Sequence, residues 1–151
     1  MEKQISKILI ANRGVPAVRI MHTCRDRRIP ATAVYSTPDR LGEHVLMADS
    51  AVHIGEAPPT ESYLDMGRII EAAFATGADA IHPGYGFLAE NELFARKVID
   101  AGLIWIGPPP DVIAAMGDKI EAKRLAIVAN VPVIPGISDV STADDIYQWL
   151  D

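Results

Sequence analysis

Residues 81–91, with the sequence IHPGYGFLAEN, have the types and spacing best suited to binding a ligand. Gly84 and Gly86 can adopt backbone angles that other residues avoid, and they let a ligand or a neighbouring chain segment come close. Tyr85 and Phe87 alternate with these glycines. Two interpretations stay open at this level: a ligand-binding loop, or a well-packed turn in which the two aromatic rings are plugs.

His82 is the histidine with the strongest case for a functional role, because it precedes the glycines at the expected end of a strand. In open α/β sheets, ligands bind beyond the carboxyl ends of the strands. The alternative is a hydrogen bond from His82 that fixes the loop. The histidines are not spaced like metal ligands, and neither a Walker loop nor a G-x-S-x-G motif is present. We therefore expect no metal site and no self-contained catalytic group.

The elements that would position this loop begin with a βαβ unit. An apolar run at 5–11 predicts a buried strand, residues 15–28 have helical spacing, and residues 31–35 predict a second strand. The turn at 12–14 contains one glycine where a dinucleotide fingerprint needs three, and no acidic residue that could hold a ribose ends the second strand. NAD or FAD binding is therefore not expected.

Strands and helices continue to alternate along the chain, which predicts an α/β protein with an open parallel sheet. Ser62 is expected to cap a helix that Gly77 ends, and the helix after the glycine loop is expected to begin near Glu90. The other predicted elements are a short helix within 38–47, strands at 51–54, 80–81 and 103–106, helices at 111–116 and 119–129, an extended segment at 131–136 and a last element from Ser141.

Composition bounds the classes of function. The chain has 151 residues, 49% of them apolar, and a net charge of −6. Such an acidic balance argues against a nucleic-acid or membrane-surface partner, since both usually require a basic face. No apolar run approaches membrane-spanning length, and no signal or transit peptide is recognisable at the start. With Cys24 alone, we expect a cytoplasmic protein without an internal disulfide.

Four segments, in order, resemble motifs of the biotin carboxylase component of biotin-dependent carboxylases. HPGYGFLAEN at 82–91 closely resembles the family's HPGYGFLSEN, and KILIANRG at 7–14 resembles its opening. Residues 35–49 resemble its AVYSxxDRxxxHVxxAD segment, and MGDK at 116–119 matches its MGDK. The resemblance covers nearly the whole chain, and it is to the front of a biotin carboxylase.

The resemblance implies a three-layer, Rossmann-like open parallel sheet with helices on both faces. It places this domain at 1–117, and a linker with the start of the ATP-grasp region at 118–151. The implied activity is ATP-dependent carboxylation of carrier-linked biotin by bicarbonate through carboxyphosphate, with Mg²⁺ or Mn²⁺. The implied partners are a biotin carboxyl carrier protein or domain, a carboxyltransferase component and a second copy of the enzyme. Because the family's catalytic groups lie mostly further on, the fragment alone is expected to be inactive.

The resemblance also implies site residues. Lys119 corresponds to the family lysine that contacts the nucleotide, and a lysine offers a mobile point charge to phosphates. Judged without the motif, it would be an ordinary solvated lysine at a helix start. The family loop that faces the active centre corresponds to His82, Gly84, Tyr85, Gly86, Glu90 and Asn91, for which loop architecture remains the alternative.

Arg19, His22 and Asp26 share one face of the helix that bacterial relatives use for dimerisation. Where the family commonly has Arg and Glu, this chain has His22 and Asp26, and Val15-Pro16 replaces the usual Glu-Ile. The loss of that Glu puts in doubt whatever polar contact it makes in relatives. Two alternatives remain: another ATP-grasp ligase of the purine or carbamoyl-phosphate type, and a non-enzymatic docking or regulatory remnant.

Overall fold

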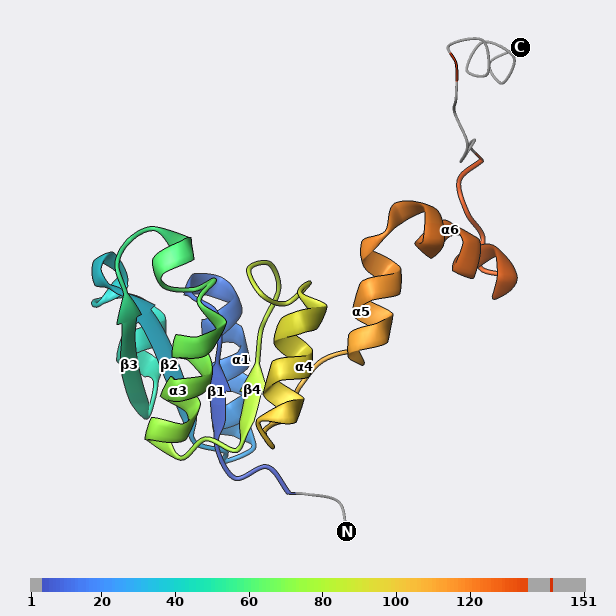
Figure 1. Ribbon diagram of the computed structural model, residues 1–151. Coiled ribbons are helices and arrows are strands. Elements are labelled where there is room, and N and C mark those ends of the chain that lie inside the picture. The colour runs from blue at the N-terminus through green and yellow to red at the C-terminus, as the bar shows by residue number, and fades with distance from the viewer. Residues whose placement is uncertain (1–3, 136–141, 143–151) are drawn as a thin grey trace. The chain divides into compact units, whose positions relative to one another are not determined.

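The computed structural model describes residues 4–135 and Thr142. The chain divides into two compact units, residues 1–113 and residues 114–151. The first unit contains a parallel β-sheet between helices, and the second contains the helix α6 (Figure 1). The division falls inside the helix α5, a few residues before the domain boundary expected after residue 117, which stays a prediction.

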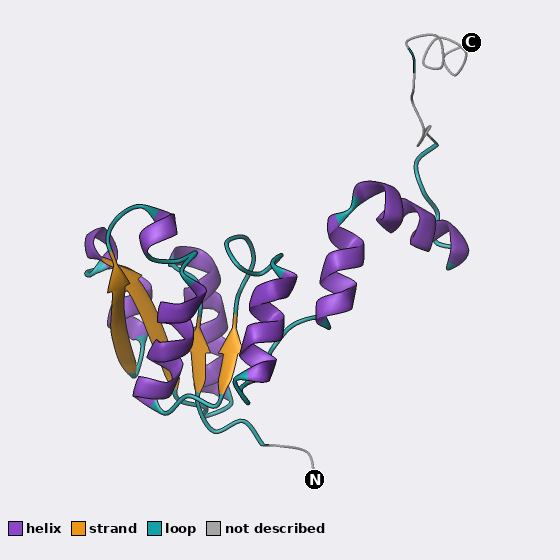
Figure 2. Ribbon diagram, in the orientation of Figure 1, coloured by secondary structure: helices purple, strands orange, loops and turns teal. Residues whose placement is uncertain are grey.

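The sheet of the first unit has five parallel strands in the order β3-β2-β1-β4-β5. The chain moves outward from β1 to β3 and then returns to place β4 on the other side of β1, as the labels of Figure 1 show; Figure 2 shows the same strands in orange between the helices. The direction of winding therefore reverses between β1 and β4, which is where open α/β sheets bind ligands. The strands are β1 (Ile8–Ile10), β2 (Ala31–Ser36), β3 (Ser50–Gly55), β4 (Ala80–His82) and β5 (Ile104–Trp105).

Helices cover both faces of this sheet, as the resemblance implied. The alternation of side chains along β1 sends Leu9 to one face and Ile8 and Ile10 to the other. Leu9 belongs to a core that includes Phe94, whereas Ile8 and Ile10 belong to a second core that includes Met21. The helices are α1 (Gly14–Asp26), α2 (Glu43–Met47), α3 (Met66–Thr76) and α4 (Glu92–Asp100), with 3₁₀ turns at Thr37–Asp39 and Pro59–Glu61.

The predicted cap of α3 was wrong. Asp65, not Ser62, caps this helix, by accepting a hydrogen bond from the N–H of Arg68 at 3.0 Å. Ser62 is fully buried at the end of the 3₁₀ turn Pro59–Glu61, four residues before α3 begins, and its hydroxyl donates to the carbonyl of Pro58. The prediction that Gly77 ends α3 is confirmed, since Gly77 has φ +70°.

The last strand of the sheet is short and is followed directly by a proline turn. β5 has two residues, and the indole N–H of Trp105 donates to the carbonyl of Pro108 at 2.9 Å. The helix α5 (Pro110–Gly117) begins immediately afterwards. The chain therefore leaves the sheet directly after β5.

The second unit is described through α6 (Lys119–Val128). The side chain of Asp118 caps this helix by accepting from the N–H groups of Ile120 and Glu121 at 2.9 and 3.0 Å. None of the α6 side chains is buried. Residues 131–135 have no regular structure, and the element predicted from Ser141 lies outside the described residues apart from Thr142.

Candidate functional site

The candidate site lies at the carboxyl ends of β1, β2 and β4. The turn after β1 carries Asn12 and Arg13, the turn after β2 carries Asp39, and the loop after β4 is the predicted ligand loop at 82–91. Because parallel strands end at the same edge, segments far apart in the sequence meet here.

Asn12 joins the turn after β1 to the loop after β4. Its amide nitrogen donates to the carbonyls of Pro83 and Tyr85 at 2.7 and 2.9 Å, and its amide oxygen accepts from the N–H of Arg13 at 2.9 Å. Asn12 is 2% exposed. A buried amide with both of its polar ends occupied holds a loop in one arrangement.

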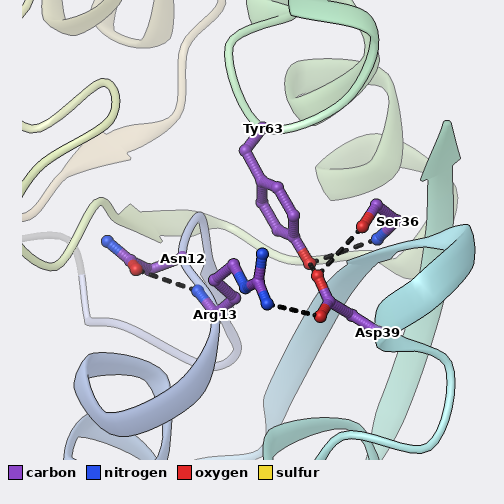
Figure 3. A network of polar contacts seen from close by, with 5 residues as sticks. All are labelled: Asn12, Arg13, Ser36, Asp39 and Tyr63. Atoms are coloured by element: carbon purple, nitrogen blue, oxygen red, sulfur yellow. Dashed lines mark hydrogen bonds and ion pairs between the residues drawn. The ribbon is translucent and has the colours of Figure 1, made fainter. Parts of the chain in front are cut away.

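Arg13, Ser36, Asp39 and Tyr63 form a polar network beside this contact (Figure 3). The carboxylate of Asp39 pairs with the Arg13 guanidinium at 2.7 Å and accepts from the Tyr63 hydroxyl at 2.8 Å. The Ser36 hydroxyl also donates to Asp39, and the Ser36 N–H donates to the Tyr63 oxygen. Burial, reinforced by the bond to Asp39, raises the pKa of Tyr63 to about 12, so its hydroxyl remains a donor at neutral pH.

The aromatic residues of the loop have different environments. Phe87 stacks on Tyr63 with 5.2 Å between ring centroids and has a positive φ of +46°. Tyr85 is 68% exposed. Phe87 thus packs on Tyr63 while remaining 36% exposed, whereas the side chain of Tyr85 is presented to the surroundings.

His82 makes a hydrogen bond that fixes the loop, and its contact with a ligand stays a prediction. Its Nδ1 accepts a hydrogen bond from the N–H of Gly84 at 3.0 Å. Burial lowers the pKa of His82, which favours the neutral imidazole, and accepting from Gly84 requires the tautomer with the proton on Nε2. The contact turns the chain directly after β4.

The remaining candidate residues of the loop, two glycines and two polar residues, have different surroundings. Gly84 and Gly86 both have φ +69°, but only Gly84 is crowded: an added Cβ would lie 2.7 Å from the Asn12 amide nitrogen. Asn91 caps α4 by accepting from the N–H of Phe94 at 3.0 Å, so α4 begins two residues later than expected. Glu90 is exposed.

The other candidate residues are exposed on helices. Lys119 is the first residue of α6, in the second unit, and its helix start is stabilised by the Asp118 cap. Arg19, His22 and Asp26 are exposed on α1 in the first unit. Their assignment to a nucleotide site and to an interface stays a prediction.

Within the described residues, no group of three or more His, Cys, Asp or Glu side chains is arranged to hold a metal ion. Across the same part of the chain, no helix is both long enough and apolar enough to span a membrane.

Sequence reasoning missed Asn12, Arg13, Asp39 and Tyr63 as parts of this region. Asn12 and Arg13 had been considered only as a turn, and Tyr63 only as part of a helix. A usable signal was available for the first two, because both directly follow a strand of a predicted parallel sheet. No local pattern connects Tyr63 to Asp39, which are 24 positions apart.

Comparison with known proteins places this arrangement in a family. Residues 4–113 match the family described as biotin carboxylase, N-terminal domain. The chain is 53% identical over 147 residues to the biotin-dependent acyl-coenzyme A carboxylase alpha3 subunit of Mycobacterium leprae (strain TN), covering 97% of this chain and 25% of that protein. It is 51% identical over 144 residues to the biotin carboxylase of Haemophilus influenzae, covering 95% of this chain and 32% of that protein.

A solved structure agrees with these sequence relatives. The biotin carboxylase domain dimer of the Hydrogenobacter thermophilus 2-oxoglutarate carboxylase, in complex with MgADP, ADP and bicarbonate, has a TM-score of 0.86 and 40% identity to this chain. The match covers 99% of this chain and 33% of that one. The chain spans about a quarter to a third of the length of these three proteins. It belongs to the family of biotin carboxylase N-terminal domains.

Proposed function

We propose that this chain serves as the N-terminal domain of an ATP-dependent biotin carboxylase. The intact enzyme, meaning this domain followed by ATP-grasp and C-terminal regions, would activate bicarbonate with ATP as carboxyphosphate. The carboxyl group would then pass to biotin held on a carrier protein or domain, for delivery to a carboxyltransferase component. The observation that carries the proposal is the family match over residues 4–113.

The role of the described residues in that reaction is to position and bind. Phosphoryl transfer depends on metal ions and positive groups that neutralise developing charge. Lys119 can supply one such charge to the nucleotide, while Mg²⁺ or Mn²⁺ would be held by residues of the intact enzyme beyond the described ones. The loop at 82–91 would face the active centre, with the exposed ring of Tyr85 as its most accessible part. The relative from Hydrogenobacter thermophilus, which was solved with MgADP and bicarbonate, supports these ligands.

A domain exchange tests this function. The matching N-terminal segment of the Haemophilus influenzae biotin carboxylase would be replaced by this chain, and bicarbonate-dependent ATP cleavage would be measured with free biotin. We expect the chimera to be active and the 151-residue chain alone to be inactive, because positioned catalytic groups act as a unit. A folded but inactive chimera would contradict the proposal, and activity of the chain alone would show that it is not merely a domain.

The intact enzyme is also proposed to be a dimer or larger, in the cytoplasm. Arg19, His22 and Asp26 lie exposed on α1, where a symmetry mate could pair with them. The imidazole of His22 lacks the five-donor guanidinium fork of Arg and is a poorer partner for a carboxylate, so the 151-residue chain should associate weakly. Light scattering checks this: a dimer that persists below micromolar concentration, unchanged by Arg19→Glu, would contradict the assignment.

The family match favours this function over an ATP-grasp ligase of the purine or carbamoyl-phosphate type. A docking or regulatory remnant without activity is distinguished by the chimera, since such a remnant has no reason to restore carboxylation.

A further inference from the structure

We propose that Asn12 is a positioning residue for the carboxylation reaction: its buried side-chain amide sets the conformation of the loop after β4 and thereby the place of Tyr85. This inference rests on the proposed function, in which that loop faces the active centre. Asn12 lies in the turn after a different strand, and its contacts with the loop are to backbone atoms, so the effect of Asn12 on Tyr85 would be indirect.

The contacts of Asn12 leave its amide no freedom. The two N–H donors are used by the carbonyls of Pro83 and Tyr85, and the oxygen by the N–H of Arg13. Because carbonyls only accept, the nitrogen must face the loop and the oxygen must face Arg13. The bond to Tyr85 is made to the residue whose ring is exposed, at 2.9 Å.

The loop also leaves room for this amide, because the residue that faces it is a glycine. Gly84 has φ +69°, and the space that its Cβ would occupy is taken by the amide of Asn12, 2.7 Å away. A side chain at this position would displace the amide from its two carbonyls. The buried amide of Asn12 can therefore reach its two carbonyls only because residue 84 is a glycine.

A second contact anchors the far side of Tyr85. Phe87 stacks on Tyr63, over whose ring the Arg13 guanidinium lies at 5.8 Å. Tyr85 is thus held between a hydrogen-bonded anchor at its own carbonyl and a stacked anchor two residues later. The backbone at Tyr85 is fixed while the ring stays accessible, which is the arrangement needed to present a side chain to a substrate.

Asn12→Asp in the intact enzyme is the direct test. The replacement keeps the shape but turns both donors into a carboxylate facing two carbonyls. A displacement of about 1 Å at a reacting centre can cost on the order of a hundredfold in rate. We therefore expect kcat/KM for biotin carboxylation to fall about ten- to a hundredfold with an unchanged KM for ATP. In the 151-residue chain, amide hydrogen exchange at residues 84–89 should become faster.

Three comparisons separate positioning from loss of stability. Tyr85→Ala should lower the same parameter, and the double variant should be no worse than the more severe single one. Asp65→Ala, which removes the cap of α3, is the control that lowers stability without touching the loop, and it should leave the kinetics unchanged. Asn12→Ser removes the same donors with a smaller neutral group.

The outcomes are distinct. If Tyr85→Ala leaves kcat/KM for biotin carboxylation unchanged, the loop has been wrongly assigned to the active centre. Both the proposed function of the loop and this inference then fail. If Tyr85→Ala lowers activity but Asn12→Asp does not, or if the two losses add fully, only the positioning role fails. If neither Asn12 variant folds, or if hydrogen exchange in the loop is unchanged, Asn12 acts otherwise than by positioning and the inference is overturned.

Discussion

The sheet of the first unit and the helix α6 of the second are stabilised in different ways. Leu9, Ile81 and Phe94 are completely buried between sheet and helices, whereas no side chain of α6 is buried. Two contacts of α6 are local, namely the Asp118 cap and the ion pair between Glu121 and Arg124. The comparison teaches that an apolar content of 49% in the whole chain does not mean that every segment is buried. Burial requires a second layer to pack against.

The largest expected difference comes from truncating one apolar side chain in each region. Phe94 is fully buried in contact with Trp105, while Ile127 is 55% exposed. Phe94→Ala should lower the free energy of unfolding by about 3–5 kcal/mol. Ile127→Ala should change it by less than about 0.5 kcal/mol. Urea unfolding of the 151-residue chain, followed by circular dichroism, measures both, and similar losses would remove the distinction between the regions.

Lys119 should matter for the nucleotide and not for folding. A lysine at the first position of a helix gains nothing from the helix dipole, which favours cations at the other end. A hydrogen bond from a charged group to a phosphate is worth about 1.5–3 kcal/mol. Lys119→Gln should therefore raise the apparent KM for ATP of the intact enzyme about ten- to a hundredfold.

The same substitution in the 151-residue chain gives the matched control for this prediction. Its melting temperature should hardly change, since replacing an exposed lysine costs less than about 0.5 kcal/mol. Unchanged ATP kinetics, or a chain that no longer folds, would make Lys119 a structural residue.

A smaller effect is expected from Asp118→Ala. Loss of an N-cap costs about 1 kcal/mol of helix stability. Because α6 has no buried side chains, this loss should appear as fraying of the helix, seen in NMR chemical shifts of residues 119–128, without a change in global unfolding. Asp65→Ala removes the cap of α3, which buries Ile69, and should lower global stability instead. Equal behaviour of the two variants would mean that the helices are supported alike.

The smallest effect concerns the pH dependence of the first unit. His44 is 2% exposed, and its Nε2 has no hydrogen-bond partner within the described residues. Burial lowers the pKa of His44 below its ordinary 6.5, against the opposing effect of the Asp39 charge. As the pH falls through 6.5 the unfolded chain takes up a proton that the folded chain does not, so stability should decrease.

Replacement of His44 by a side chain that does not titrate isolates this contribution. Urea unfolding at several pH values from above to below 6.5 should show a shallower loss of stability on acidification in His44→Gln than in the parent chain. His53→Gln is the matched control for the same substitution at an exposed position. An unaltered slope in His44→Gln would assign the acid sensitivity to other groups, His82 among them.

The sequence predicted the fold better than the contacts of the site. Apolar runs and helical spacing located the strands and helices, because these patterns are local and glycines such as Gly77 end helices by a local mechanism. The cap of α3 was mispredicted because Ser62 and Asp65 are both good capping residues, and the turn at 62–64 that delays the helix to Met66 has no strong local signal. The contact of Asn12 with a loop more than 70 residues away depends on strand order, which local patterns do not determine.

The proline turn after β5 has a consequence for how the protein behaves at high concentration. An exposed sheet edge is a template for pairing with another chain, and proteins protect such edges with very short strands and with proline. β5 has only two residues, and the three residues from Pro108 to Pro110 have no backbone N–H to offer a neighbouring strand. The sheet is therefore protected on this side against the strand-by-strand growth that leads to fibrils.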